Sequence, residues 1–520
     1  MDAEGPMGRG DFMWGVAASA FQHEGGYNGP GDPLNNWHPW EQSRRAECSG
    51  ASVGFWDRYE EDFDLAASLG LNAFRFGFEW ARAQPTRSPG RSGPPAMDEE
   101  ALARYAAMAV AARRRGLEPV VTLHHFTHPA WMGDDPWLGA EAPALFAEFA
   151  VRAVGAANAA LEGAGLRPLR WIVTVNEPNM LVLNTYSARN FPARGHRGPR
   201  SMSVACCRLL EAHVRAARAI RDLYARHPAW GKPMLSTNTY TSDVYWNDKF
   251  VADLLAAPQH VSREGAWEWL GNRATGFDEA VRRAGLPRHH GVRYWVGALV
   301  KRAYGAAARR ACQFERFGPL LDLLYERPGE PALDFIGMDY YDPFVAHMLR
   351  VPRLDEIWDR RHPFPDWLVH HWTSKWWDWV ALPEGLGLFA RLFHADFPGV
   401  PIIIAENGMA YRKRWRLELP WRSDMMRRSN FLKLHLAEVE VLKKDGIPVA
   451  GYFHWSLTDN YEWGSYAPRF GLYQIDFHDA RRERVALDEL GDNPSRTYSD
   501  WVRRHEGDLR ENSAILRSGS

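Results

Sequence analysis

The stretch IIIAENGM, residues 402–409, decides the fold of this chain. Three isoleucines and an alanine form an apolar, β-rich run, and Asn407-Gly408 directly after it is a turn signal. Such a run is typical of a strand buried on both faces of a parallel sheet. It ends on a carboxylate, Glu406, which is either a paired structural charge or part of a functional site at the strand end.

The same arrangement of helix, glycine and apolar strand recurs along the chain. Helical periodicity over residues 57–69 ends at Gly70, and the β-rich run LNAFRFG follows. A glycine between a helix and such a run marks the second half of a βαβ unit. Eight strands are expected, near residues 12–17, 71–77, 118–125, 170–176, 234–240, 333–341, 401–406 and 448–456. We therefore predict an α/β fold, a (β/α)8 TIM barrel with extended βα loops.

The barrel is expected to form a single catalytic domain over residues 1–520. The stretches 241–330 and 342–380 are too long for plain βα loops, so we expect them to carry extra helices. An exposed loop is predicted for residues 86–96. Residues 1–10 and about 508–520 are predicted to be disordered tails.

The composition excludes several classes of protein. The chain has 520 residues and a net charge of −1, which gives no reason to expect a nucleic acid or an anionic membrane surface as a partner. We find no window of 18 apolar residues and expect no transmembrane segment. Four cysteines without metal-ligand spacing make no disulfide framework, and the start of the sequence lacks the pattern of a signal peptide. These features favour a cytoplasmic protein.

In a barrel of this kind the site lies at the carboxyl ends of the strands. Two of these ends carry carboxylates, Glu177 on the fourth strand and Glu406 on the seventh. Sugars require polar contacts to their hydroxyls and an aromatic platform, and two carboxylates are the minimal set for glycoside hydrolysis. Further polar and aromatic residues at or after strand ends are Gln22, Arg75, His124, His125, Asn176, Asp339, Tyr340, Tyr341, Trp455, Asp459, Glu462 and Trp463.

Four blocks of sequence resemble, in order, the motifs of the family 1 glycoside hydrolases, the retaining β-glucosidases and their relatives. The blocks are FMWGVAASAFQHEGG, TVNEP, IIIAENG and GYFHWSLTDNYEWGSYAPRFGLYQIDF, and they span residues 12 to about 477. The resemblance implies a retaining β-glycosidase that acts on unphosphorylated β-D-glucosides or related hexosides through a covalent glycosyl-enzyme. It implies no cofactor, no metal and a small-molecule glycoside as the partner.

The resemblance also assigns roles to individual residues. Glu177 matches the acid/base and Glu406 the nucleophile, and Arg75 and Tyr341 match the groups that hold the nucleophile. The residues that match sugar contacts are Gln22, His125, Asn176, Tyr341, Trp455, Glu462 and Trp463. Arg75 and the Tyr341 hydroxyl would keep Glu406 ionised, and the charge of Glu406 would raise the pKa of Glu177. A retaining pair should place its carboxyl groups about 5–5.5 Å apart.

A cluster of tryptophans precedes the seventh strand. Trp379 stands where the family has a tryptophan before PEGL, which resembles an aglycone platform. Trp372, Trp376 and Trp377 lie just before it, and their spacing fits neither one helical face nor one strand face. We therefore expect some of these rings to be exposed. We predict that Trp376, Trp377 and Trp379 bind an apolar aglycone, aryl or long alkyl, or a glycolipid headgroup presented at a surface, and the alternative is that they only cap the barrel as packing residues.

The sequence departs from the family pattern at several positions. His23 follows Gln22, Phe126 follows His125, Asp339 replaces the more frequent asparagine, and His454 precedes Trp455. Asp339 could raise the pKa of the nucleophile or hold Arg75. The preferred sugar, the natural aglycone, the pH optimum and the oligomeric state remain open.

Other functions are less well supported by the residues. The order His-His-Phe-Thr-His over residues 124–128 lacks the glutamate that the zinc protease motif places beside its first histidine. A transglycosylase would use the same residues as a hydrolase, so the sequence does not separate the two. A non-catalytic sugar-binding barrel is disfavoured because both carboxylates are present. A thioglycosidase is disfavoured because that relative carries glutamine at the position of Glu177.

Overall fold

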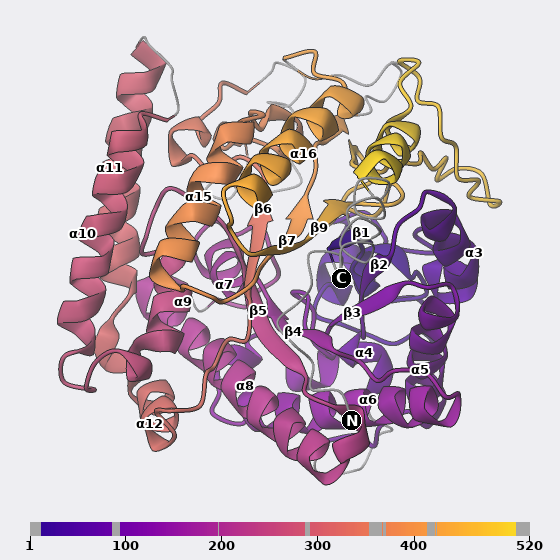
Figure 1. Cartoon of the computed structure of the whole chain (residues 1–520), viewed down its shortest axis with the longest axis horizontal. Helices are drawn as coiled ribbons and strands as arrows, with labels where there is room; N and C mark the ends of the chain where they lie inside the picture. Colours follow the sequence, from indigo (N-terminus) through magenta and orange to yellow (C-terminus); the bar gives the residue numbers. More distant parts are fainter. Residues whose placement is uncertain are drawn as a thin grey trace, which may run out of the picture.

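The computed structural model describes residues 12–85, 94–195, 197–286, 292–352, 364, 367, 371–412, 422 and 424–505. Eight parallel strands close into a barrel in chain order, and the last pairs with the first (Figure 1). They are β1 (Met13–Ala17), β2 (Ala73–Gly77), β3 (Glu118–Thr122), β4 (Trp171–Asn176), β5 (Met234–Tyr240), β6 (Ile336–Tyr340), β7 (Ile402–Asn407) and β9 (Val449–Trp455). The predicted TIM barrel and all eight predicted strands are confirmed.

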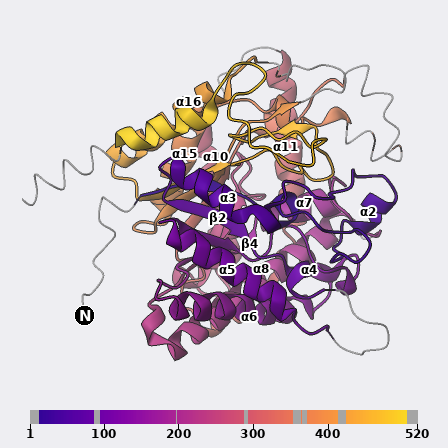
Figure 2. The same cartoon turned by 90° about the vertical axis from the view of Figure 1, so that its right-hand side faces the viewer.

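Helices surround the barrel, with α16 and α6 on opposite sides of the strands (Figure 2). The helices that connect successive strands include α3 (Phe55–Ser68), α5 (Glu99–Arg114), α6 (Ala142–Gly163), α8 (Pro199–Arg226), α12 (Gly318–Glu326), α15 (Pro383–Asp396) and α16 (Arg428–Lys444). Helix α5 shows how the sequence sets their limits. The Asp98 carboxylate accepts from the first backbone amides, and Gly116 follows the last turn with a φ of 76°.

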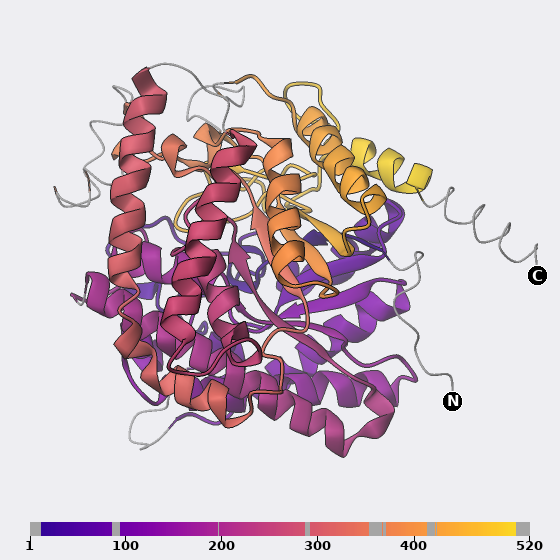
Figure 3. The same cartoon turned by 60° about the vertical axis from the view of Figure 1, so that its left-hand side comes forward.

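The loops at the carboxyl ends of the strands carry extra helices, as expected for residues 241–330 and 342–380. Two of these, α10 (Ala266–Ala284) and α11 (Val292–Ala311), lie along one flank of the molecule (Figure 3). The remaining short helices are α1 (Ala20–His23), α2 (His38–Gln42), α4 (Trp80–Ala83), η1 (Ala130–Met132), η2 (Pro136–Leu138), α7 (Pro178–Tyr186), η3 (Pro228–Trp230), α9 (Lys249–Ala256), η4 (Ala257–Gln259), η5 (Phe314–Phe317), η6 (Val345–His347) and η7 (Trp376–Asp378).

A second, small sheet was not predicted. Strand β8 (Tyr411–Arg412) pairs antiparallel with β10 (Pro468–Arg469), which ties the loop after β7 to the loop after β9. Strands of two residues are too short to leave a period-2 pattern in the sequence. The pairing nevertheless fixes two loops that border the carboxyl end of the barrel.

The core has two layers because strand side chains alternate between the two faces of the sheet. Along β7, Ile403 and Ala405 join the cluster inside the barrel, while Ile402 and Ile404 join the larger cluster between strands and helices. The apolar run that suggested a strand buried on both faces is therefore packed on both faces. Its last residues project the site carboxylate at the barrel mouth.

One helix bears on the expectation of no transmembrane segment. Helix α6 is long and apolar enough to cross a membrane by length and composition. Phe146, Phe149 and Leu161 on this helix are buried in the protein core. A helix buried in a protein core can be as long and as apolar as a membrane-spanning one, so α6 is only weak evidence for a membrane span. The predicted tails and most of the predicted loop 86–96 lie outside the described residues.

Candidate active site

Glu406 lies at the carboxyl end of β7, and two groups hold its carboxylate. Its Oε1 accepts from Arg75 Nη1 at 2.7 Å, and its Oε2 accepts from the Tyr341 hydroxyl at 2.9 Å. Burial raises the pKa of Glu406, and the Arg75 charge and both hydrogen bonds oppose that rise. The structure thus brings together the three residues predicted to form the nucleophile and its support.

Glu177 follows β4 in a left-handed backbone conformation, with a φ of 38°. Its backbone N–H donates to Asn238 O at 2.9 Å, which anchors the residue on β5 and places its side chain over the barrel centre. Burial raises the pKa of the Glu177 carboxyl well above its usual range, and the negative charges of Asp339 and Glu406 raise it further. These are the conditions for a carboxyl that keeps its proton.

The separation of the two carboxyl groups fits a retaining glycosidase. Oxygens of Glu177, Asp339 and Glu406 all lie within 4.8 Å of one another. Retaining pairs are about 5–5.5 Å apart, whereas inverting pairs are about 6.5–9.5 Å apart to leave room for water. The arrangement can therefore support attack by one carboxylate on the sugar carbon whose leaving oxygen the other protonates.

Arg75 is fixed from three sides. Its Nε donates to Thr122 Oγ1 at 3.0 Å, and its Nη2 donates to Asn176 Oδ1 at 2.5 Å. Asp339 Oδ1 lies 4.0 Å from Nη1, so Asp339 also compensates the charge of the guanidinium. This agrees with the expectation that Asp339 holds Arg75. Arg75 is 1% exposed, which makes it a fixed charge at the bottom of the site.

Gln22, Trp455 and Glu462 form the polar part of the expected sugar site. Gln22 Nε2 donates to Glu462 Oε2 at 3.0 Å, and Trp455 Nε1 donates to Glu462 Oε1 at 2.9 Å. Burial raises the pKa of Glu462 to about 7, and these donors oppose the rise. Gln22 on α1 and Trp455 on β9 thus hold the carboxylate of Glu462, which lies in the loop after β9, in a fixed orientation.

His125 lies between two aromatic rings. Its ring stacks on Trp455 and on Trp463, with centroid separations of 5.8 Å in both cases. Its Nε2 is 3.4 Å from Asn176 Nδ2, which connects it to the Arg75 network. The predicted sugar contacts His125, Asn176, Trp455 and Trp463 therefore form one continuous surface beside the carboxyl pair.

The tryptophan cluster divides into different environments. The Trp379 ring is half-buried and lies 5.1 Å from the Tyr341 ring, while Trp376 is half-buried and Trp372 is exposed. Trp377 is buried, and the Arg412 guanidinium lies 4.8 Å from its ring centroid. The prediction that some of these rings are exposed is confirmed, but Trp377 is a packing residue rather than an aglycone contact because its ring is already covered.

The histidines that depart from the family pattern do not reach the carboxyl pair. His23 packs edge-on against Trp455, and burial lowers its pKa to about 3. His454 lies on the outer face of β9, 6.3 Å from Tyr498, and burial lowers its pKa to about 3 as well. His124 packs against Trp137 at 5.1 Å. Within the ranges that the structure describes, His124, His125 and His128 form no shared ligand set.

Asn238, Tyr240 and Asn460 contact the predicted site residues but were not predicted from the sequence. The Tyr240 ring stacks on Tyr341, with a centroid separation of 6.2 Å. Asn238 Nδ2 donates to Asn176 Oδ1 at 2.8 Å and to the Asp339 carboxylate, and Asn460 Oδ1 accepts from Gln22 at 3.2 Å. A signal was present on β5, which ends in the run STNTY, residues 236–240, with polar side chains at consecutive positions. No residue at the carboxyl end of β5 is among the predicted site residues.

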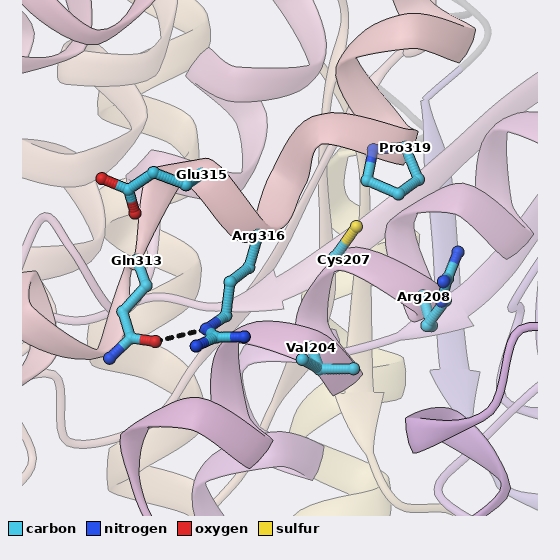
Figure 4. A pocket seen from close by; sticks show the side chains of 7 residues that line it. All are labelled: Val204, Cys207, Arg208, Gln313, Glu315, Arg316 and Pro319. Atoms are coloured by element: carbon cyan, nitrogen blue, oxygen red, sulfur yellow. Dashed lines mark hydrogen bonds between the residues drawn. The ribbon is translucent and has the colours of Figure 1, made fainter.

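A second concave region lies away from the strands. A cavity of about 630 Å³ opens on the outer side of α8, between η5 and α12, and Arg208 and Arg316 line it (Figure 4). Arg208 pairs with Glu211 at 2.6 Å, and Arg316 donates to Gln313. Both arginines thus have polar partners, and the cavity contains none of the residues predicted to act on a substrate.

Comparison with known proteins yields one family. The model of glycosyl hydrolase family 1 matches residues 7–490. β-Glucosidase 40 of Arabidopsis thaliana is 26% identical and covers 90% of this chain and 88% of its own length. A bifunctional β-D-glucosidase/β-D-fucosidase of Bifidobacterium breve is 26% identical, with 96% and 97% covered. A β-galactosidase of Sulfolobus acidocaldarius is 25% identical, with 90% of each chain covered.

Solved structures share the fold. The β-glucosidase from Thermotoga maritima in complex with castanospermine aligns with a TM-score of 0.64 at 20% identity and covers 96% of this chain and 98% of its own. The AHE enzyme from Alicyclobacillus herbarius aligns with a TM-score of 0.65 at 20% identity, with 97% and 99% covered. The barrel and its extended loops are thus those of a known class of structure.

Proposed function

Because the chain belongs to glycosyl hydrolase family 1, we propose that it hydrolyses the β-glycosidic bond of unphosphorylated β-D-glucosides or related hexosides with retention of configuration. One observation carries the proposal. Two buried carboxyl groups with oxygens within 4.8 Å of each other have opposite environments, one held by Arg75 and Tyr341 and the other facing negative charge. That asymmetry supplies an ionised nucleophile and a protonated acid.

The first step forms a covalent glycosyl-enzyme. A Glu406 oxygen attacks the anomeric carbon while the bond from that carbon to the leaving oxygen breaks. Glu177 gives its proton to the leaving oxygen, and the aglycone departs as a neutral alcohol. Arg75 and Tyr341 hold the Glu406 carboxylate in place for the attack, so little reorganisation is required at the moment of reaction.

The second step releases the sugar. Once Glu406 is an ester its negative charge is gone, so the proton affinity of Glu177 falls and its carboxylate accepts a proton from water. The water oxygen attacks the anomeric carbon from the side that the aglycone left, and the bond to Glu406 breaks. The product keeps the configuration of the substrate, and both carboxyl groups return to their starting forms.

Glu462 gives the site its preference for unphosphorylated sugars. Its two oxygens accept from Gln22 and Trp455, so it stays fixed as an acceptor for sugar hydroxyls. A phosphate at this position would meet a carboxylate, and like charges at close range disfavour binding. The names of the relatives include glucosidases, a bifunctional glucosidase/fucosidase and a galactosidase. We therefore propose a β-D-glucoside or a related hexoside as the substrate and do not single out one sugar.

An apolar aglycone, aryl or alkyl or part of a lipid, is the second element of the proposal. Trp379 lies against Tyr341, which itself contacts Glu406, and Trp376 packs half-buried beside the same cluster. A leaving group attached to a sugar above Glu406 would emerge beside these rings. Stacking of an aryl group on such a ring contributes about 0.5–1.5 kcal/mol beyond area burial, which supports an apolar leaving group there.

We also propose a cytoplasmic location. The four cysteines are free, and Cys206 and Cys207 are adjacent on the buried face of α8. Unpaired thiols suit a reducing compartment, which supports the expected cytoplasmic location.

The test is a panel of nitrophenyl glycosides with both anomers and several hexoses, followed by NMR of the first product. We expect hydrolysis of β-anomers only, with a β-sugar as the first product. A slow fluorinated glycoside should label the peptide that contains Glu406. An α-sugar product, or a label on another peptide, would contradict the mechanism. Added alcohol as an acceptor distinguishes transglycosylation, because the sugar then appears on the alcohol rather than on water.

A further inference from the structure

Three carboxyl groups share one buried space with one compensating cation. Glu177, Asp339 and Glu406 converge within 4.8 Å, and among the described residues Arg75 is the only cation within salt-bridge reach of the group. If all three were ionised, the cluster would keep two uncompensated negative charges in a nearly water-free site. Such a state is strongly disfavoured, so the cluster holds protons.

The two oxygens of Asp339 have different surroundings. Its Oδ2 accepts from the Asn238 amide. Its Oδ1 is buried, lies 4.0 Å from Arg75 Nη1, and accepts no N–H among the residues that the structure describes. The Glu177 carboxyl faces Asp339 within hydrogen-bonding reach. A proton on Glu177 therefore gives Asp339 the donor that it lacks, as an O–H···O⁻ bond between the two side chains.

We propose that Asp339 is a positioning residue that shares the catalytic proton of Glu177 and thereby sets its proton affinity in both steps of the reaction. The inference rests on the proposed function and adds to it a residue outside the nucleophile and acid/base pair. Asp339 is 0% exposed, whereas Glu177 and Glu406 are 6% and 4% exposed. Asp339 thus lies behind the reacting pair and acts through Glu177 rather than on the substrate.

The second step is where this arrangement has its largest effect. In a cluster of two carboxyl groups, formation of the ester removes the only negative charge that faces the acid/base. Here Asp339 stays charged when Glu406 is esterified, so Glu177 remains a stronger base toward water. The reaction itself is unchanged: water gives a proton to Glu177 as its oxygen bonds to the sugar, and the ester bond to Glu406 breaks.

Of the other groups around the pair, Glu462 titrates in the working range, because burial raises its pKa to about 7. The remaining neighbours do not. Burial raises the pKa of the Tyr240 and Tyr341 hydroxyls well above the usual range, and burial with the Arg75 charge lowers that of His125 well below it. Asn238 and Asn176 carry no charge. Burial raises the pKa of Asp339, and the charge of Glu406 raises it further. Ionisation of Glu462 strengthens sugar binding as the pH rises and so contributes to the acid limb of the pH profile. The loss of activity on the basic limb therefore reports the proton shared by Glu177 and Asp339.

Asp339→Asn tests the inference because it keeps the shape of the side chain. The amide oxygen can still accept from Glu177, but the negative charge is gone. We expect the basic limb of kcat/KM to move to lower pH by about 1–3 units, the size expected for a charge at this range. The acid limb, which reports Glu406 and Glu462, should move less. The kcat for a dinitrophenyl glycoside, for which release of the sugar is rate-limiting, should fall as well.

Two further variants separate this role from a structural one. Asn238→Ala removes the amide that stabilises the Asp339 charge, so the affinity of the carboxyl pair for its shared proton should rise. The basic limb of kcat/KM for this variant should therefore move to higher pH, in the opposite direction to the shift in Asp339→Asn. In a Glu177→Gln background, adding Asp339→Asn should leave the remaining pH profile with the dinitrophenyl substrate unchanged. A merely structural residue would not shift the limb in opposite directions in the two variants.

The outcomes also separate this inference from the proposed function. If the unmodified enzyme hydrolyses β-glycosides with the label on Glu406, but Asp339→Asn leaves the basic limb in place, the inference is overturned and the function stands. A shift that persists without Glu177 would assign the titration to Asp339 alone and overturn the shared proton. If the unmodified enzyme does not hydrolyse β-glycosides, the proposed function fails first.

Discussion

Glu177 and Glu406 are the same amino acid in one buried space, and their neighbours give them different tasks. Glu406 accepts from Arg75 and Tyr341, which favours its ionised form. Glu177 faces Asp339 and Glu406, which favours its protonated form. The difference arises from fixed partners rather than from burial, because both side chains are buried to a similar degree.

Glu177→Ala should separate substrates by their leaving groups. Without an acid, formation of the glycosyl-enzyme from an alkyl glycoside should slow on the order of 10²–10⁴-fold, the usual contribution of a general acid. A dinitrophenolate leaves without a proton, so the burst of dinitrophenolate should persist with that substrate. Stopped-flow and steady-state rates measure the two cases. Glu315→Ala, at an exposed position near α8, is the matched control. Equal losses for both substrates would remove the acid role from Glu177.

Glu462 should give the Michaelis constant a pH dependence of its own. Burial raises its pKa from 4.5 to about 7, so in the folded protein it is largely protonated below pH 7 and ionised above it. The ionised form accepts sugar hydroxyls more strongly. KM for an unphosphorylated glucoside should therefore fall as pH rises from 6 to 8, and in Glu462→Gln this trend should disappear. Glu462→Gln should also narrow the discrimination against 6-phosphoglycosides, and an unchanged preference would contradict that role.

The strands and the carboxyl pair could be predicted because both leave strong signals in the sequence. Most barrel strands are apolar runs that follow a helix and a glycine, and Glu177 and Glu406 stand at the ends of such runs. Asn238 gave a weaker signal, since its role depends on the register that places β5 beside Asp339 on β6. The packing of Trp377 under Arg412 could not be predicted, because the two residues are distant in sequence and their contact depends on loop geometry.

The segment η7 should show two kinds of tryptophan. Trp376 is half-buried near the expected leaving group, so Trp376→Ala should weaken hydrolysis of octyl or aryl glycosides several-fold more than that of a disaccharide. Stacking of about 0.5–1.5 kcal/mol beyond area burial corresponds to such a ratio. Trp377 is buried, so Trp377→Ala should instead lower stability by about 3–5 kcal/mol and affect all substrates alike. The ratio of kcat/KM for an octyl or aryl glycoside to that for a disaccharide measures the first effect, and thermal unfolding measures the second. If both variants show the same ratio of kcat/KM, the cluster has a structural role only.

The molecule separates the groups that react from the groups that hold its outer helices together. The reacting carboxyls lie at the carboxyl ends of the strands, whereas α9, α10 and α15 are joined by a charge network on the flank. Asp253 is 0% exposed and accepts from Lys249 at 2.9 Å, from Arg273 at 3.1 Å and from the Tyr245 hydroxyl at 2.9 Å. Asp396 at the end of α15 pairs with the same two cations.

Asp253→Asn should therefore lower stability and leave the chemistry intact. The change keeps the size of the side chain but leaves Lys249 and Arg273 with Asp396 as their remaining partner, and breaking a buried pair costs about 3–5 kcal/mol. Asp445→Asn is the matched control. Its side chain is 49% exposed and that of its partner Arg391 is 41% exposed, so this ion pair should contribute only about 0–1 kcal/mol to the free energy of unfolding. Thermal unfolding should show a clearly lower midpoint for Asp253→Asn only. Both variants should keep the parent kcat and pH profile at low temperature, since neither residue contacts the site. A change in the pH profile of Asp253→Asn would mean that the outer helices and the carboxyl cluster are coupled.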